Sequence, residues 1–249
     1  MKKEFLQEGS FEPLQEGEDL KMVGALQAGD YPVFRYGLAE GNDSQPVDKI
    51  HHQIIALIEK GFGQTYGEDL SDEDVQKFLG GGEIYLLSTA RREIIGLEVV
   101  KMLVLQASKI FFTAATVLHP DHQGKRLHTD FKEFIIQQEK PNFIAGRTQS
   151  PAVYRSYTHG TGTVYPNVGQ PIPQEIQHLG QELASSLCMN NFDPATFIQR
   201  KAYGEGVYGQ GTYPQIDPSL HPDLHQLFSR LHVEEGDAFL ILKQIKSSP

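Results

Sequence analysis

The segment from residue 83 to residue 118 constrains the fold most, because three apolar strand patterns follow one another closely. EIYLLS (83–88) and EIIGLEVVKMLVL (93–105) are separated only by TARR, which is short enough for a hairpin. KIFFTAATVL (109–118) is apolar at nearly every position, as expected for a strand that is covered on both faces. These patterns predict a central sheet.

Helical patterns flank these strands. VDKIHHQIIALIEKGF (47–62) places apolar residues at helical spacing, and Gly61 is expected to end that helix. A second short helix is expected from Ser71, and an amphipathic helix over 123–138 is expected to bury Leu127, Phe131, Phe134 and Ile135. Further strands are expected at 31–39 and 142–146, and a further helix at 151–157. The order predicts an α/β (α+β) chain with a mixed sheet flanked by helices.

The chain divides into three parts by composition and by the pattern of apolar residues. Residues 1–30 are polar and weakly periodic, so we expect a loose N-terminal arm or an atypical first element. Residues 31–166 carry most of the strand and helix patterns. Residues 167–249 contain one strongly apolar strand, DAFLILKQI (237–245), and are expected to form a C-terminal extension that completes or covers the sheet.

Composition excludes several classes of function. The net charge of −10 disfavours nucleic acid as a partner, because its phosphate backbone would be repelled. No apolar run approaches the roughly 20 residues that a membrane span needs, and the N-terminus lacks the apolar segment of a secretory signal. A single cysteine, Cys188, excludes an intramolecular disulfide framework. We therefore expect a cytoplasmic protein without a membrane partner.

Residues 116–135, TVLHPDHQGKRLHTDFKEFI, connect an apolar strand to an amphipathic helix through a basic turn. The first N–H groups of a helix lack intrahelical acceptors and carry a partial positive charge, so a phosphate can bind there. Gly124 would allow a close approach, and Lys125 and Arg126 would add charge. An ordinary strand-to-helix connection with a solvated basic turn explains the same residues equally well.

The stretch VLHPDHQGKRLHTDFKEFI resembles the acyl-CoA-binding motif of the GNAT superfamily of N-acetyltransferases. In that motif a strand and a Pro-type turn precede Gln/Arg-x-x-Gly-x-Gly/Ala at the start of a helix, and Gln123 matches its first position. The resemblance implies a mostly antiparallel GNAT-like sheet, acetyl-CoA or another acyl-CoA as co-substrate, no metal, and a small-molecule amine as acceptor. It also implies a set of cofactor-binding residues: Val117, Leu118, Gln123, Gly124, Lys125, Arg126, Leu127, His128 and Ser150.

The same resemblance implies catalytic roles. In IAGRTQSPAVYRSYTHGTG, Ser150 stands where the family has Asn, and Tyr157 follows seven residues later, where a family tyrosine often protonates the thiolate of CoA. Tyr154 is a nearby alternative for that role. The backbone N–H of Leu118 would stabilise the oxyanion of the intermediate. Candidates for the general base are Glu98, His119 and Glu83.

Two departures from the motif leave alternatives open. Arg126 and His128 stand where the family has Gly and Gly/Ala, so the turn either binds CoA with altered contacts or has lost CoA. A catalytically degenerate binding or sensor protein of the same fold is thus an alternative. An enzyme that makes long-chain N-acyl amino acids or acyl-homoserine lactones is another, and a homodimer is left open.

A zinc site is the last alternative, because His119, His122 and His128 supply the three imidazoles of a catalytic centre. His119 and His122 flank a proline in a turn, however, and no HExxH pattern is present. We therefore expect no metal.

Overall fold

The computed structural model describes residues 14, 20–26, 30–36, 48–62, 79, 82–203 and 217–245. The chain forms two compact units. The first comprises residues 1–101 and 114–138, and the second comprises 102–113 and 139–249. The second unit contains residues on both sides of residue 166, because the strand at 238–244 pairs with the strand at 143–148.

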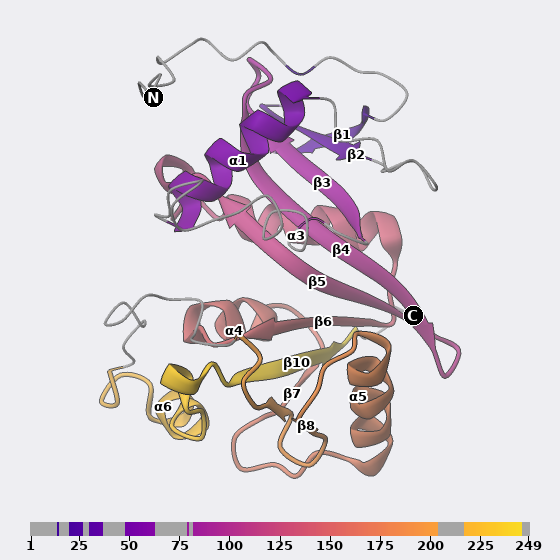
Figure 1. Ribbon diagram of the computed structural model, residues 1–249, viewed down its shortest axis with the longest axis vertical. Coiled ribbons are helices and arrows are strands. Elements are labelled where there is room, and N and C mark those ends of the chain that lie inside the picture. Colours follow the sequence, from indigo (N-terminus) through magenta and orange to yellow (C-terminus); the bar gives the residue numbers. More distant parts are fainter. Residues whose placement is uncertain are drawn as a thin grey trace, which may run out of the picture. The chain divides into compact units, whose positions relative to one another are not determined.

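The first unit is an antiparallel arrangement of strands covered by helices (Figure 1). Its elements are β1 (Leu20–Leu26), β2 (Tyr31–Tyr36), α1 (Asp48–Phe62), β3 (Glu83–Ser88), most of β4 (Ile94–Leu105), the end of β5 (Ser108–Leu118), the 3-10 turn η2 (Pro120–His122) and α3 (Leu127–Glu139). The strand order is β1-β2-β3-β4-β5. The two-residue turn Gln106–Ala107 joins β4 to β5, and both residues have the positive φ that such hairpin turns require.

Residues 20–26 form β1, inside the segment expected as an N-terminal arm. The strand pairs antiparallel with β2 from Leu20–Tyr36 to Leu26–Tyr31. Only its two end residues are buried, so alternation along it is weak and the sequence did not identify it as a strand.

Helix α1 extends to Phe62, one residue beyond Gly61, where its end was predicted. A β-carbon on Gly61 would lie 2.3 Å from Cγ1 of Val117 on β5, so the glycine lets α1 approach the strand closely. Its apolar face joins residues of β2, β3, β4 and β5 in the core of this unit; the α1 members are Ile50, Ile54, Ile55, Leu57 and Ile58.

The second unit is built around the C-terminal strand. Its elements are the remainder of β4 and β5, β6 (Phe143–Thr148), α4 (Pro151–Thr158), β7 (Thr163–Tyr165), α5 (Gln174–Ser186), β8 (Phe192–Asp193), β9 (Ile198–Gln199), α6 (Pro222–Phe228), the 3-10 turn η3 (Val233–Glu235) and β10 (Ala238–Gln244). Strand β10 pairs antiparallel with β6, β7 and β9, while β5 and β6 are parallel. The predicted strand at 237–245 therefore completes the sheet of this unit, and the predicted α+β class with a mostly antiparallel sheet is confirmed.

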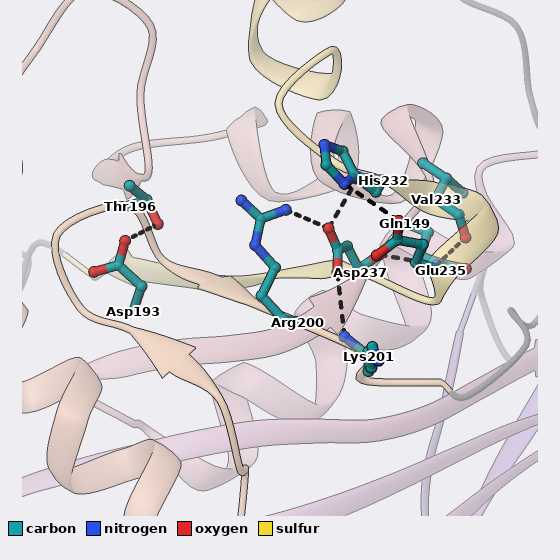
Figure 2. A network of polar contacts seen from close by, with 9 residues as sticks. All are labelled: Gln149, Asp193, Thr196, Arg200, Lys201, His232, Val233, Glu235 and Asp237. Carbon is teal, nitrogen blue, oxygen red and sulfur yellow. Dashed lines mark hydrogen bonds and ion pairs between the residues drawn. The ribbon is translucent and has the colours of Figure 1, made fainter.

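The carboxylate of Asp237 joins three segments of the second unit (Figure 2). It is fully buried, forms an ion pair with Arg200, and accepts backbone N–H groups of Lys201 (3.1 Å) and His232 (2.9 Å). Burial acts to raise its pKa, but these hydrogen bonds and the Arg200 charge outweigh burial and hold the pKa of Asp237 below its ordinary value. Gln149 donates to the backbone oxygen of Asp237 at 2.8 Å, so the network also reaches the start of α4.

One prediction on local structure, the short helix from Ser71, lies outside the described residues apart from Leu79. No helix in the described part of the chain is both long and apolar enough to span a membrane.

Candidate functional site

The strand-to-helix turn of the first unit begins at the end of β5. The N–H of His119 donates to the oxygen of Ile95 at 2.8 Å, which continues the contact of β5 with β4. Because consecutive N–H groups of a strand point to opposite edges, the N–H and C=O of Leu118 point away from β4. The side-chain amide of Gln123 donates to the oxygen of Leu118 at 3.0 Å. Gln123 therefore braces the turn against the strand.

The helix begins at Leu127 and not near Gln123, which corrects the predicted start. Residues 120–122 form the 3-10 turn η2, and Gln123 is extended, with φ −70° and ψ 159°. The first bond of α3 runs from the N–H of Asp130 to the oxygen of Arg126 at 2.9 Å. Within this helix Leu127, Phe131 and Ile135 are buried as predicted, whereas Phe134 is only partly buried.

Two residues of the turn have left-handed backbone conformations, Gly124 with φ 75° and Arg126 with φ 61°. A β-carbon on Gly124 would meet no atom within 4 Å, so its glycine meets a conformational need and not a packing need. Arg126 adopts the same conformation with a side chain, at a cost of about 1–3 kcal/mol. The position where the GNAT motif has glycine thus keeps a glycine-like backbone although it carries Arg126.

The turn gathers positive charge. Lys125 and Arg126 are exposed, and in the described part of the chain neither forms an ion pair with a carboxylate. They stand immediately before the N-terminus of α3, where the N–H groups of Leu127, His128 and Thr129 lack intrahelical acceptors. Charge and donors together make this turn a favourable place for an anion.

His128 is an uncharged residue of this turn at neutral pH. Burial, and then the nearby charge of Lys132, lower its pKa to about 4. The second position that the motif keeps small therefore holds a partly buried, neutral imidazole and adds no charge to the turn.

The three predicted bases have different surroundings. Glu98 on β4 is fully buried, with Oε1 3.8 Å from Nζ of Lys132 on α3. His119 is partly exposed, and its Nδ1 accepts the N–H of Asp121 at 3.3 Å, so Nε2 is the nitrogen left for a proton transfer. Glu83 forms an ion pair with Arg35 across β3 and β2, an arrangement typical of a structural surface carboxylate.

The histidines that suggested zinc are not gathered as ligands. The rings of His119 and His122 are 6.0 Å apart between centroids, and the ring of His122 makes an edge contact with Tyr31. No group of three His, Cys, Asp or Glu side chains is placed to hold a metal ion among the residues that the structure describes.

The predicted tyrosine lies in the second unit, at the end of the pairing between β5 and β6. That register runs from Ile110–Phe143 to Thr113–Gly146. Tyr157 of α4 is buried and donates its hydroxyl to the oxygen of Ala145 at 3.2 Å. A β-carbon on Gly146 would lie 2.1 Å from that hydroxyl oxygen and 3.7 Å from the oxygen of Thr113. Gly146 is thus a site residue that the sequence analysis missed, and a glycine inside the strand pattern IAG was the available signal.

Helix α4 is held at both ends. Ser150 is its N-cap, and its hydroxyl accepts the N–H of Val153 at 3.4 Å. Buried Lys243 of β10 donates to the oxygen of His159 just after the helix. The hydroxyl of Tyr154 donates to the oxygen of Pro166 at 2.7 Å, and burial raises the pKa of Tyr154. Its hydroxyl is engaged away from Ala145, so Tyr157 is the better candidate for an acid.

The structure divides the predicted site residues between the two units. The first unit contains Glu98 on β4, His119 after β5, and the predicted residues at the end of β5, in the turn and at the start of α3: Val117, Leu118, Gln123, Gly124, Lys125, Arg126, Leu127 and His128. The second unit contains Tyr157 on α4 and Ser150, the N-cap of that helix.

Comparisons with known proteins give matches among solved structures alone, since no family model and no curated protein matches the sequence. The NatC complex bound to Gag peptide and CoA matches with 12% identity over 86% of this chain and 99% of that chain, at a TM-score of 0.40. Naa50 of Arabidopsis thaliana, in complex with the bisubstrate analogue CoA-Ac-MVNAL, matches with 10% identity over 86% of this chain and 99% of that chain, at 0.39. The acetyltransferase of the GNAT family from Streptococcus pneumoniae matches with 10% identity over 81% of this chain and 98% of that chain, at 0.40. At TM-scores this low a match carries no functional argument, so we infer the function from the turn and from Tyr157.

Proposed function

We propose that the chain is an acyltransferase that moves an acetyl or other acyl group from acyl-CoA to a primary amine. The observation that carries this proposal is the turn between β5 and α3. It combines left-handed Gly124 and Arg126, two exposed cations without carboxylate partners, and the free N–H groups of a helix N-terminus. A pyrophosphate is the ligand group that matches such a set of donors.

The positive charge of the turn contrasts with the acidic character of the whole protein. With a net charge of −10, unneutralised cations at the positive end of a helix concentrate positive potential at one place. A turn that binds phosphate has to leave its cations without carboxylate partners, as Lys125 and Arg126 are in the described part of the chain. Lys125 and Arg126 would hold the phosphates electrostatically, and the N–H groups of the first turn of α3 would donate hydrogen bonds to them.

In the reaction, the neutral amine attacks the thioester carbonyl carbon and forms a tetrahedral intermediate with a positively charged nitrogen and an oxyanion. A base takes one proton from that nitrogen, the C–S bond breaks to release the thiolate of CoA, and an acid delivers one proton to the thiolate. Nε2 of His119 suits the base, since Nδ1 is engaged by Asp121; Glu98 is the alternative. The N–H of Leu118, which points away from β4, suits the oxyanion.

Tyr157 is the proposed acid. Its hydroxyl lies where the pairing of β5 and β6 reaches its last residues, Thr113 and Gly146, and it is shielded from water. A shielded phenol beside the last paired residues of two strands is suited to deliver a proton to a sulfur atom that lies between those strands beyond their pairing.

A CoA-binding protein without catalysis is the second candidate. Two observations favour it: the Tyr157 hydroxyl is already engaged by Ala145, and His128 fills a position that the motif keeps small. Such a protein would bind CoA at the same turn but would turn over no amine.

A thermal-shift titration with acetyl-CoA and CoA tests the proposal. A ligand that binds only the native state at a hundred times its dissociation constant stabilises by about 2.7 kcal/mol, so the melting temperature should rise clearly. The K125Q/R126Q variant should lose this shift, while R91Q, which removes an exposed cation elsewhere in the same unit, should keep it. No shift with either ligand at millimolar concentration would contradict CoA binding.

Turnover separates the two candidates. Release of free CoA thiol from acetyl-CoA, followed over a panel of primary amines, is expected for the enzyme. A rise in melting temperature without release of CoA thiol in the presence of any amine would favour the binding protein.

A further inference from the structure

Arg147 of β6 lies on one face of the second unit's sheet together with Gln199 of β9. In the antiparallel registers, Arg147 pairs with Leu240 of β10, and Gln199 pairs with Ala238 two residues earlier on β10. Directly paired residues share a face, as do residues two apart along a strand. Leu240 belongs to the core cluster that includes residues of α5, so this is the face that α5 covers.

The guanidinium of Arg147 is held in place from two directions. Its Nη1 donates to Oε1 of Gln199 at 3.2 Å, and its Cζ lies 4.6 Å from the ring centroid of Tyr203. The hydroxyl of Tyr203 donates in turn to the backbone oxygen of Arg147 at 3.1 Å. The stacked ring and the amide fix the orientation of the guanidinium plane.

One donor of this fixed group lacks an acceptor. Nε of Arg147 is buried without a hydrogen-bond partner, and no carboxylate in the described chain pairs with the guanidinium. Arg200, in the same unit, is paired with buried Asp237 (Figure 2). A buried donor without an acceptor is costly, so natural structures supply one from the chain, from water or from a ligand.

We propose that Arg147 binds an oxyanion, the carboxylate or phosphate group of a small acidic ligand, through Nε and Nη2. Because Nη1 is engaged by Gln199, the edge formed by Nε and Nη2 is the one left for a ligand. Two parallel N–H groups of that edge match two oxygens of a carboxylate or phosphate. The residue is partly exposed but its Nε is buried, so an oxyanion has to displace what covers Nε in order to supply the acceptor that this atom lacks.

This site is separate from the proposed acyltransferase chemistry. The β-carbon direction of Gly146 leads to the Tyr157 hydroxyl, and neighbouring residues of a strand point to opposite faces. The side chain of Arg147 therefore lies on the face of β6 opposite to Tyr157. Oxyanion binding at Arg147 and acyl transfer can each be present without the other.

Nitrogen-15 spectra of arginine side chains test the proposal directly. The Nε–H signal of Arg147, assigned by its loss in R147K, is followed while inorganic phosphate or acetate is added, with chloride at equal ionic strength as the reference. A saturable shift of this signal is expected with at least one of the two anions, and the responding anion identifies the ligand group. The Nε–H signal of Arg200 should stay in place, because Asp237 already pairs with that arginine.

Variants complete the test. R147K keeps the charge but loses the planar edge, so it should weaken binding of the responding anion by at least about tenfold. R230Q removes one exposed cation from the same unit and should bind as the wild type does. The proposal is overturned if neither anion moves the Arg147 signal at tens of millimolar, or if R147K, with its fold intact by circular dichroism, binds as tightly as the wild type.

Discussion

The hydroxyl oxygen of Tyr157 lies 2.1 Å from the point where a β-carbon on Gly146 would stand. Helix α4 can place this phenol against β6 only because residue 146 has no side chain. The close approach also lets the hydroxyl donate to the oxygen of Ala145. Gly146 and Tyr157 are therefore matched to each other, and their substitutions should be coupled.

G146A should destabilise the second unit by about 1–3 kcal/mol, because an inserted methyl group forces the tyrosine to move. In G146A/Y157F the atom nearest to the new methyl group is Cζ, at 3.0 Å, so part of the loss should be recovered. Urea unfolding of the wild type, both single variants and the double variant measures the coupling. If the losses of unfolding free energy in the single variants simply added up in the double variant, the methyl group at residue 146 would not clash with the hydroxyl of Tyr157.

Y157F should lower kcat for a responsive amine by about 10²-fold or more while KM for acetyl-CoA stays near its original value, since a general acid acts on the leaving group and not on binding. Y154F is the matched control, because it removes a buried hydroxyl of the same helix that donates to Pro166 instead. Equal losses of kcat in the two variants would remove Tyr157 from the acid role.

Much of the strand pattern could be predicted from the sequence. The apolar run at 83–88 corresponds to β3, and the predicted strands at 93–105 and 109–118 differ from β4 and β5 by one residue. A strand that is buried on both faces is apolar at nearly every position, so it can be recognised from the sequence alone. Strand β1 gives no such signal because five of its seven residues are not buried.

The site could be predicted only in part. The predicted start of α3 was too early because an arginine in the sequence does not indicate a left-handed backbone, whereas a glycine at position 126 would have indicated one. Gly61 was expected to end a helix, yet it serves a close contact with Val117, which depends on a strand more than 50 residues away. Such contacts arise from tertiary packing and cannot be obtained from local patterns.

R126G should stabilise the first unit by about 1 kcal/mol, because glycine adopts φ 61° without the steric cost that arginine bears. G124A is the opposite change at a neighbouring position. A β-carbon there meets open space, so any loss comes from the backbone alone. Thermal unfolding of both variants measures the change in stability that each substitution causes. A lower stability of R126G would mean that the arginine side chain makes a stabilising contact.

K132M should destabilise the first unit by about 3–5 kcal/mol, because it leaves the carboxylate of Glu98 buried without its cation. E98Q/K132M removes both charges and should recover much of the loss. Urea unfolding at neutral pH compares the variants. If the double variant were as unstable as K132M, the ion pair would not be what links α3 to β4.

His128 should make the protein less stable as the pH falls below 6.5. Burial and Lys132 hold the pKa of His128 at about 4, against an ordinary value of 6.5. Between these values the unfolded chain binds a proton on His128 and the folded chain does not, so stability is present above pH 6.5 and is lost progressively down to about pH 4. The loss should be on the order of 3 kcal/mol.

The difference in unfolding free energy between wild type and H128N, measured by urea titration from pH 7 to pH 4, isolates this effect. Acid-sensitive groups common to both proteins, such as Asp237, cancel in the difference. As the pH falls, this difference should shift steadily in favour of H128N. A flat difference for H128N would mean that the imidazole accepts a proton in the folded protein as readily as in the unfolded chain, and it would then add a positive charge to the turn at mildly acidic pH.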